Sequence, residues 1–241
     1  MKGRFAEEFC RWGAGLRQLF FTRSCAVCEA PLSEGESYVC KHCLEDIPLT
    51  YFWSYSENAA MERFCDGCHV YNAAALFFYR HESPWCEIVR QFKYGRRLGL
   101  GLWAARLLGG YLAEGGLYGE VQAVVPVPLH PLKRWKRGFN QAEIIARGVA
   151  GRLANIPVVT HLLRRRRYTS TQTRRSASSR QRNVSGAFVL NRREMERLRT
   201  AGVRHIPLTD DVCTTGATLS ECVRLLQEHF TVSVATLGFV E

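Results

Sequence analysis

The stretch IPLTDDVCTTGATL, Ile206 to Leu219, passes from an apolar run through two adjacent acids to a run of small residues. The apolar run predicts a buried parallel strand, and the apolar spacing of residues 217–230 predicts an amphipathic helix. Residues 213–216 then form a strand-to-helix turn. Open α/β sheets bind their ligands at such turns, beyond the carboxyl ends of the strands. The stretch therefore predicts an α/β fold with a ligand site at this turn.

The turn has the composition of a phosphate site. Its small residues offer successive backbone N–H groups and hydroxyls, and none carries a bulky side chain: Thr214, Thr215, Gly216, Ala217 and Thr218. The positive end of the helix dipole favours an anion at the same place. Asp210 and Asp211 come directly before the turn, where carboxylates repel a phosphate but accept hydrogen bonds from sugar hydroxyls. The spacing therefore predicts a ribose 5-phosphate ligand.

The alternative interpretation of this stretch is purely structural, with a strand end followed by helix-capping residues, since Thr and Asp are common caps. An adjacent pair of acids is costly to hold at a buried strand end without a polar partner, however. A Walker loop does not fit either, because no Lys follows Gly216. The ligand-binding interpretation explains more of the pattern.

From residue 70 onward, short apolar runs alternate with helical patterns. Helical spacing covers residues 81–95, 98–116, 139–154, 193–202 and 217–230. The other strand candidates are residues 70–80, 121–128, 156–159, 187–190 and 232–240. This alternation predicts an α/β domain with flanking helices and a mainly parallel sheet of about five strands.

The cysteines set the first part of the chain apart. Six of the ten cysteines form three CxxC pairs between Cys25 and Cys68. Two pairs joined by a short connection can deliver four thiolates in the tetrahedral arrangement of a closed structural zinc site. We therefore predict a Zn2+ ion on the first four of them: Cys25, Cys28, Cys40 and Cys43.

The third pair leaves alternatives open. Cys65 and Cys68 could replace one of the first two pairs, or a second metal could recruit His42 or His69. A redox-active CxxC would require a pair at a helix start after a strand, and none of the three pairs has that setting. We predict a cysteine-rich module over residues 22–69, preceded by an amphipathic helix over residues 1–21.

The chain has no pattern typical of export or membrane insertion. Residues 1–21 alternate apolar and charged side chains and lack the apolar core and cleavage site of a signal peptide. No stretch reaches the roughly 18 apolar residues of a membrane span. We expect a cytoplasmic protein with reduced thiols and no membrane span, which also favours metal over disulfides.

The net charge of +11, from 33 Lys and Arg against 22 Asp and Glu, suits phosphorylated or nucleic-acid partners. Much of the excess lies in residues 164–182, which contain eight Arg and one aromatic residue, Tyr168. Arginine clusters of this kind neutralise phosphates without sequence preference. Stacking aromatics are sparse in this segment, so single-stranded DNA binding is one alternative for it and not the first.

The segment DDVCTTGAT closely resembles the loop that binds 5-phosphoribosyl 1-pyrophosphate (PRPP) in type I phosphoribosyltransferases. Thr209 stands where that family more often has an apolar residue. Together with residues 125–142 (VPVPLHPLKRWKRGFNQA), residues 167–188 and the CxxC module, the chain is similar to the ComF competence-protein family, which includes GntX-type proteins. The resemblance runs from about Cys25 to Glu241.

The resemblance implies a zinc ribbon joined to a type I phosphoribosyltransferase-like domain, here over residues 70–241, with a role in natural transformation for some members. It places a pyrophosphate-binding loop after Val127, and a flexible loop that closes the site over residues 168–188. Candidate diphosphate or lid residues, each at a position that matches a family motif, are Lys93, Arg137, Asn140, Gln172 and Arg180, with Gly138 as a backbone requirement.

These features predict a phosphoribosyltransferase that binds PRPP with Mg2+ and transfers the phosphoribosyl group to an acceptor that the sequence does not identify. Asp210 and Asp211 would orient the ribose and stabilise the positive charge that develops on it. No general base is recognisable in the sequence. Two alternatives therefore remain: a non-catalytic sensor of PRPP or a nucleotide that acts through DNA-uptake proteins, and a factor that handles single-stranded DNA.

Overall fold

The computed structural model describes residues 23–64, 67–166 and 186–241, which fall into two compact units. One unit ends at Ile47 and the other runs from Pro48 to Glu241. The predicted helix over residues 1–21 lies outside the described residues. The domain boundary after residue 69 stays a prediction, although residues 48–64 pack within the larger unit, as shown below.

The smaller unit is organised by turns and side-chain caps. Its helix α2 (Lys41–Glu45) is capped by Cys40, whose sulfur accepts the Cys43 N–H at 3.5 Å. The Glu36 carboxylate accepts the N–H groups of Ser33 and Lys41 at 2.7 and 2.6 Å. Because both CxxC pairs sit in such turns, local backbone geometry alone can aim their sulfurs inward.

The larger unit is built on a four-stranded parallel sheet with strand order β1-β6-β5-β2. Its strands are β1 (Ala73–Phe78), β2 (Val125–Pro126), β5 (His205–Cys213) and β6 (Thr231–Phe239). Every pairing is parallel, for example Leu208 with Val234 between β5 and β6. The predicted α/β fold with a parallel sheet is therefore confirmed.

The described part of the sheet has four strands where about five were expected. Residues 156–159 contribute only an isolated parallel bridge, between Val124 and Val158. Residues 187–190 join a separate two-stranded antiparallel pair, β3 (Leu163–Arg165) with β4 (Phe188–Leu190). Apolar composition identified these segments as extended, but it could not assign them to a sheet, because pairing is decided by tertiary contacts.

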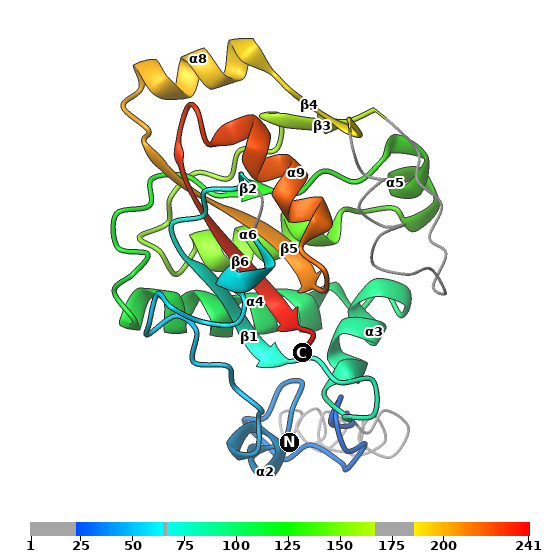
Figure 1. Ribbon diagram of the computed structural model, residues 1–241. Helices are drawn as coiled ribbons and strands as arrows, with labels where there is room; N and C mark the ends of the chain where they lie inside the picture. Colours follow the sequence, from blue (N-terminus) through cyan, green and yellow to red (C-terminus); the bar gives the residue numbers. More distant parts are fainter. Residues whose placement is uncertain (1–22, 65–66, 167–185) are drawn as a thin grey trace, which may run out of the picture. The chain divides into compact units, whose positions relative to one another are not determined.

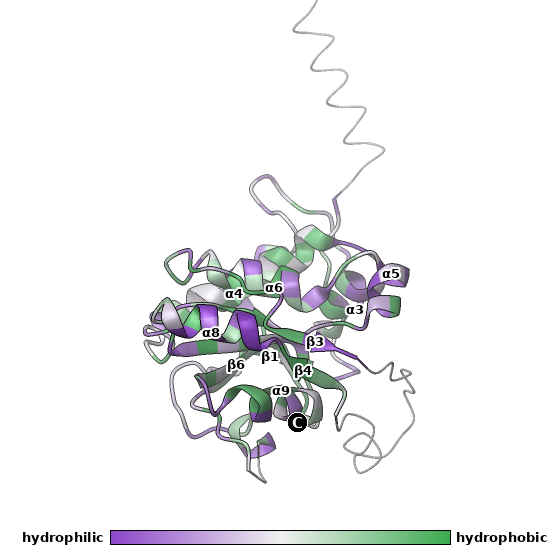
Figure 2. Ribbon diagram, turned by 90° about the horizontal axis from the view of Figure 1, so that it is seen from above, coloured by the Kyte–Doolittle hydropathy of each residue, from purple (hydrophilic) through white to green (hydrophobic). Residues whose placement is uncertain are grey.

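Helices cover both faces of this sheet. Figure 2 shows α4 (Leu98–Glu114) and α6 (Gln141–Ala150) on one face and α9 (Ala217–Leu226) on the other. Coverage on both faces explains why almost all of β5 and β6 is buried, as parallel strands require. The remaining helices of the larger unit are η1 (Met61–Arg63), α3 (Cys86–Tyr94), α5 (Pro131–Arg137) and α8 (Arg192–Thr200).

Close approach of α4 and α6 depends on a glycine. A Cβ atom on Gly148 would lie only 2.4 Å from the Cβ of Ala105, so no larger residue fits there without moving a helix. On the sheet beneath, the buried Tyr118 hydroxyl donates to the carbonyl of Val234 at 2.6 Å. The first contact joins α6 to α4, and the second ties the segment after α4 to the central strand β6.

Residues 48–64 pack on the sheet of the larger unit. Leu49 forms an antiparallel bridge with Phe77, and the Phe52 ring meets Phe239 edge-on at 5.4 Å. In Figure 1 the carboxyl end of β5 lies next to the start of α9 and faces the side on which α3 and α5 lie. Among the described residues, no helix is both long enough and apolar enough to cross a membrane.

Candidate functional site

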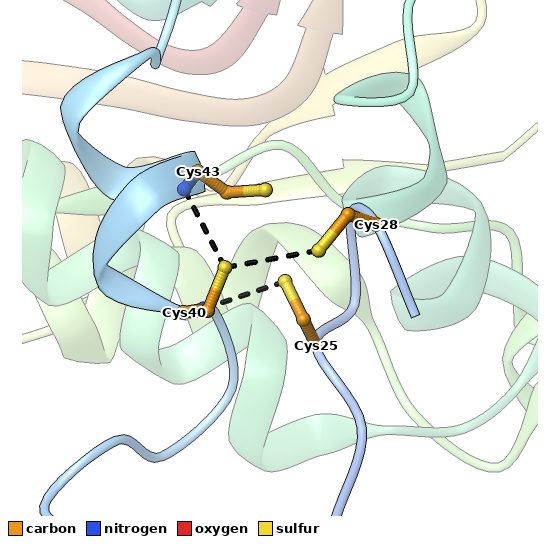
Figure 3. Close-up of side chains that lie close together, drawn as sticks. All are labelled: Cys25, Cys28, Cys40 and Cys43. Atoms are coloured by element: carbon orange, nitrogen blue, oxygen red, sulfur yellow. Dashed lines mark hydrogen bonds between the residues drawn. The ribbon is translucent and has the colours of Figure 1, made fainter. Parts of the chain in front are cut away.

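Four cysteines of the smaller unit converge on one point. The sulfurs of Cys25, Cys28, Cys40 and Cys43 all lie within 4.8 Å of one another, and Figure 3 shows them directed toward a common centre. The Cys28 and Cys40 sulfurs are 3.7 Å apart. Four thiolates around a zinc ion at about 2.3 Å would be separated by about 3.8 Å. The cluster could therefore bind a metal ion such as zinc.

Backbone N–H groups prepare this cluster for a cation. Burial acts to raise the pKa of Cys25, but N–H groups of Cys28, Cys40 and Val27 point at its sulfur and lower that pKa to about 6. The Cys40 N–H donates to this sulfur at 3.3 Å. These N–H groups favour the thiolate form of Cys25, and thiolates are the metal-binding form of cysteine.

The described residues support the first two CxxC pairs over the alternatives. Cys25, Cys28, Cys40 and Cys43 are the only group of three or more potential metal ligands within the parts of the chain that the structure describes. Cys68 belongs to the larger unit, where its thiol donates to the carbonyl of Ser220 at 3.5 Å. Its partner Cys65 lies outside the described residues.

Two acids lie at the carboxyl end of the central strand β5. The N–H of Asp211 donates to Oδ1 of Asp210 at 2.9 Å. Lys93, near the end of α3, places its Nζ 3.0 Å from Oδ1 of Asp211. The Lys93 and Asp211 side chains are only 23% and 17% exposed, so this ion pair is largely shielded from water. Lys93 and the two acids, which are far apart in sequence, thus meet at this edge of the sheet.

Shielding from water gives Asp210 an unusual protonation state. Burial, followed by the charge of Asp211, raises the pKa of Asp210 from 3.8 to about 7, against the opposing effects of Lys93 and Arg165. Burial lowers the pKa of Lys93, but Asp211 outweighs this effect and the net pKa is raised. The site therefore combines Asp211, which pairs with Lys93, and Asp210, whose pKa is raised by burial.

The small-residue loop follows as the sequence predicts. β5 ends at Cys213, and α9 begins at Ala217. Gly216 has a left-handed backbone with φ +71°, and a Cβ there would lie 2.9 Å from the carbonyl oxygen of Arg63. Thr214 is exposed and Thr215 is half-buried. Glycine is thus required for the turn, and the loop leaves threonine hydroxyls near solvent.

The segment after Val127, where the resemblance places a pyrophosphate-binding loop, contains a short basic helix. Its cations, Lys133, Arg134, Lys136 and Arg137, lie on α5, which His130 caps through its ring Nδ1 at 3.2 Å from the Leu132 nitrogen. Gly138 ends this helix with φ +85°, which confirms its predicted backbone role. A proline at the first helical position favours this start.

Asn140 has a structural role in addition to its predicted one. Its carbonyl oxygen caps α6 by accepting the Ala142 N–H at 3.2 Å, and its amide nitrogen donates to the Val127 carbonyl at 3.1 Å. The side chain is buried and links the end of β2 to the start of α6. Ligand binding by Asn140 stays a prediction.

Lys133 of α5 is affected by neighbouring cations of α5 and β3. Burial and the charges of Arg165 and Arg137 lower the pKa of Lys133, which indicates that these cations lie close together. Arg165 also acts on the pKa of Asp210 and stacks over the Phe188 ring at 5.1 Å. Gln172 and Arg180, the two predicted lid residues, lie outside the described residues.

Two aromatic side chains are exposed on the basic surface, which the sequence did not lead us to predict. Trp135 of α5 is 82% exposed, and Tyr94 at the end of α3 is 71% exposed. The Arg137 guanidinium lies over the Tyr94 ring at 5.6 Å. The segment KRWKR, residues 133–137, could have predicted this exposure. An aromatic residue between cations at the surface is a feature of nucleic-acid binding surfaces.

Fold and cysteine cluster together define an α/β protein that carries a tetracysteine module. No family model matches the chain. It is 28% identical to Competence protein F of Haemophilus influenzae over 219 residues, which cover 87% of this chain and 93% of that protein.

The chain is also similar to DNA utilization protein YhgH. The E. coli strain K12 protein is 31% identical over 157 residues, or 64% of this chain and 66% of that protein. The Salmonella typhimurium protein is 32% identical over the same length. The chain is homologous to Competence protein F and to YhgH, which agrees with the predicted resemblance to the ComF family.

Proposed function

We propose that this protein acts in DNA uptake and binds PRPP, or a related ribose 5-phosphate, at the carboxyl end of β5. The names of its relatives, competence and DNA utilization proteins, support the process. The observation that supports this choice of ligand is the order of chemical groups along one edge of the sheet. A paired acid and a protonatable acid are followed by a glycine turn and the N-terminus of α9.

Each part of the ligand would meet groups of matching chemistry. The 5-phosphate would occupy the turn from Thr214 to Thr218, where N–H groups and hydroxyls can donate. Ribose hydroxyls would donate to Asp210 and Asp211. The diphosphate would meet Lys93 and Arg137, and Mg2+ would accompany it, held largely by ligand oxygens.

Binding of a diphosphate would rearrange one observed contact. Lys93 is bonded to Asp211 at 3.0 Å, so Lys93 can reach the ligand only by sharing or leaving this carboxylate. In a transfer reaction, a nitrogen nucleophile would bond to C1 of the ribose as the bond from C1 to the diphosphate oxygen breaks. Asp210 would lie at the ribose, and its raised pKa, about 7, would suit a general acid or base.

Calorimetric titration with PRPP and Mg2+ tests the binding step. We expect the wild type to bind, and Asp210→Asn/Asp211→Asn to bind at least about tenfold more weakly, because two hydrogen bonds to charged acceptors are lost. The control Glu196→Gln/Glu228→Gln removes two exposed acids elsewhere and should bind as the wild type does. Undiminished binding by the Asp210/Asp211 variant would contradict the proposal.

Release of pyrophosphate distinguishes an enzyme from a sensor. Purified protein is mixed with PRPP, Mg2+ and each of a panel of purine and pyrimidine bases, and free pyrophosphate is measured. Release that depends on one base and is lost in Asp210→Asn/Asp211→Asn identifies a phosphoribosyltransferase. Binding without release from any base supports the sensor, which uses the same site.

A second candidate function, binding of single-stranded DNA, is favoured by Trp135 and Tyr94. Stacking of a base on an exposed aromatic ring contributes about 1–3 kcal/mol, and neighbouring arginines neutralise the phosphates. Fluorescence anisotropy with labelled oligothymidylate should show affinity that falls with salt and falls about tenfold in Trp135→Ala. Tyr71→Ala, which removes a ring that is 60% exposed elsewhere, is the control. Equal affinity for both variants would exclude stacking on Trp135.

A further inference from the structure

A cavity of about 470 Å³ lies between the end of β2, helix α5 and the antiparallel pair β3–β4. None of the residues that line it belongs to the acids of β5 or the turn before α9. Its volume is within the range of about 300–1,000 Å³ that small-molecule sites occupy. Helix α5 and the β3–β4 pair that border it are visible in Figure 1.

Part of the lining of this cavity, here called the apolar wall, consists of aliphatic residues. Five aliphatic residues from four segments form it: Pro128, Leu129, Pro131, Leu163 and Val189. The prolines and Leu129 follow β2, and Leu163 and Val189 come from β3 and β4. Such a wall offers no hydrogen bond to a sugar or phosphate, so it favours a flat, weakly polar group such as a nucleobase.

The rest of the lining, here called the arginine wall, is mainly cationic. Four arginines line it, namely Arg134, Arg164, Arg165 and Arg166, and His161 adds a further imidazole. Among the described residues that line the cavity, none is acidic. Arg134 already pairs with Glu143 at 3.4 Å, but no acid among the described residues lines the cavity itself, so this lining favours a bound anion. Guanidinium groups match phosphate with paired hydrogen bonds.

We infer that this cavity binds a nucleotide, with its base against the apolar wall and its phosphate on the arginines. A bare diphosphate would satisfy the arginines but would leave the apolar wall unused. The inference goes beyond the proposed function, because Leu129, Arg164 and Arg166 take no part in the ribose 5-phosphate site. The nucleotide is either a free mononucleotide or one unit of a single strand.

NMR of methyl-labelled protein tests the inference directly. Methyl signals of Leu129, Leu163 and Val189 are assigned and followed during separate titrations with deoxycytidine 5′-monophosphate, decathymidylate and orthophosphate. We expect the nucleotide probes to shift these methyl signals. Shifts with the mononucleotide identify a free nucleotide as ligand, and shifts with decathymidylate alone identify a unit of a strand. No shift with either probe would overturn the inference.

Two variants separate the arginine wall from the apolar wall. Arg164→Ala/Arg166→Ala changes two exposed side chains and should weaken nucleotide binding about tenfold. The control Arg193→Ala/Arg199→Ala makes the same change of charge on exposed positions of α8 and should bind as the wild type does. An equal loss in both variants would show nonspecific attraction and contradict a built site.

Leu129→Asn tests the base-binding wall at a half-buried position. We expect it to weaken the nucleotide while leaving orthophosphate unaffected, and equal weakening of both would contradict the assignment of the apolar wall. Asp210→Asn/Asp211→Asn should still bind the nucleotide probe. The two proposals can therefore fail separately: loss of PRPP binding leaves the cavity intact, and loss of nucleotide binding leaves the β5 site intact.

Discussion

The cysteine cluster and the end of β5 are both sites for charged ligands, but they are assembled in different ways. The cysteine cluster is local, since its four sulfurs come from residues 25–43 and backbone N–H groups of the same turns donate to them. The β5 site combines residues that are far apart in sequence, since Lys93 meets Asp211 and Arg165 acts on Asp210. The first site is therefore encoded by spacing, and the second by the fold.

A consequence of this difference concerns stability. Burial and the neighbouring cysteines raise the pKa of Cys43, so the four sulfurs become thiolates together only when a cation binds, and a small unit has little apolar core to stabilise it without the metal. The β5 acids are held by a sheet that is stable through buried strands and covering helices. Loss of the metal should thus unfold the smaller unit, whereas changes at β5 should alter binding more than folding.

The largest expected effect follows from removal of the cysteine ligands. Purified protein should contain about one zinc ion per chain, and Cys25→Ser/Cys40→Ser should contain none, measured by atomic emission. Structural zinc binding contributes on the order of 10 kcal/mol to folding, so hydrogen exchange in residues 23–47 should become fast. Cys68→Ser is the control and should keep its zinc. Zinc that persists in the double variant would refute the ligand set.

The next effect is a pH dependence that comes from Asp210. The folded pKa of about 7 lies above the ordinary value of 3.8, so the folded state binds the proton more tightly. The stabilisation that Asp210 contributes is fully present below pH 3.8. It decreases as the pH rises toward 7, by at most about 4 kcal/mol. Urea unfolding from pH 4 to 8 should show this fall in the wild type relative to Asp210→Asn. Parallel pH curves for the two proteins would contradict the shielding of Asp210.

A smaller effect is expected at the turn before α9. Gly216→Ala must adopt φ near +71° and approach the Arg63 carbonyl, which should cost about 1–3 kcal/mol. The control Gly110→Ala lies inside α4, where an added Cβ meets nothing within 4 Å, and should stabilise by up to about 1 kcal/mol. Urea unfolding measures both. Similar stability of the two variants would show that the turn tolerates a side chain.

The smallest effect on stability concerns the ion pair that joins α3 to β5. Lys93→Met leaves Asp211 without its cation at a mostly shielded site, at a cost of about 1–2 kcal/mol. The matched Arg197→Met breaks an exposed pair with Glu194 and should cost less than about 1 kcal/mol. Equal costs would mean that Lys93 and Asp211 are screened by water as strongly as a surface pair.

Features encoded by neighbouring residues were predictable from the sequence. The CxxC spacing anticipated the convergence of the four cysteines, and the apolar run before Asp210 anticipated strand β5 and its turn. The left-handed Gly138 was likewise anticipated. In each case the information lies within one turn or one strand, where composition and spacing determine geometry.

Features that depend on tertiary contacts were not predictable. Residues 187–190 read as a strand of the main sheet but pair with β3, because register and partner follow from packing and not from apolar content. The basic segment 131–137 forms a helix, and only its exposure identifies Trp135 as a surface residue. No sequence pattern indicated that Lys93 bonds to Asp211, since a chain of over a hundred residues separates them.

A crystal structure of the protein with PRPP, or with ribose 5-phosphate, and Mg2+ tests the central claim most directly. The proposed function predicts the 5-phosphate on the turn from Thr214 to Thr218, with the ribose hydroxyls on Asp210 and Asp211 and Lys93 turned toward the diphosphate. A ligand bound elsewhere, with Lys93 still paired to Asp211 and the turn unoccupied, would contradict it.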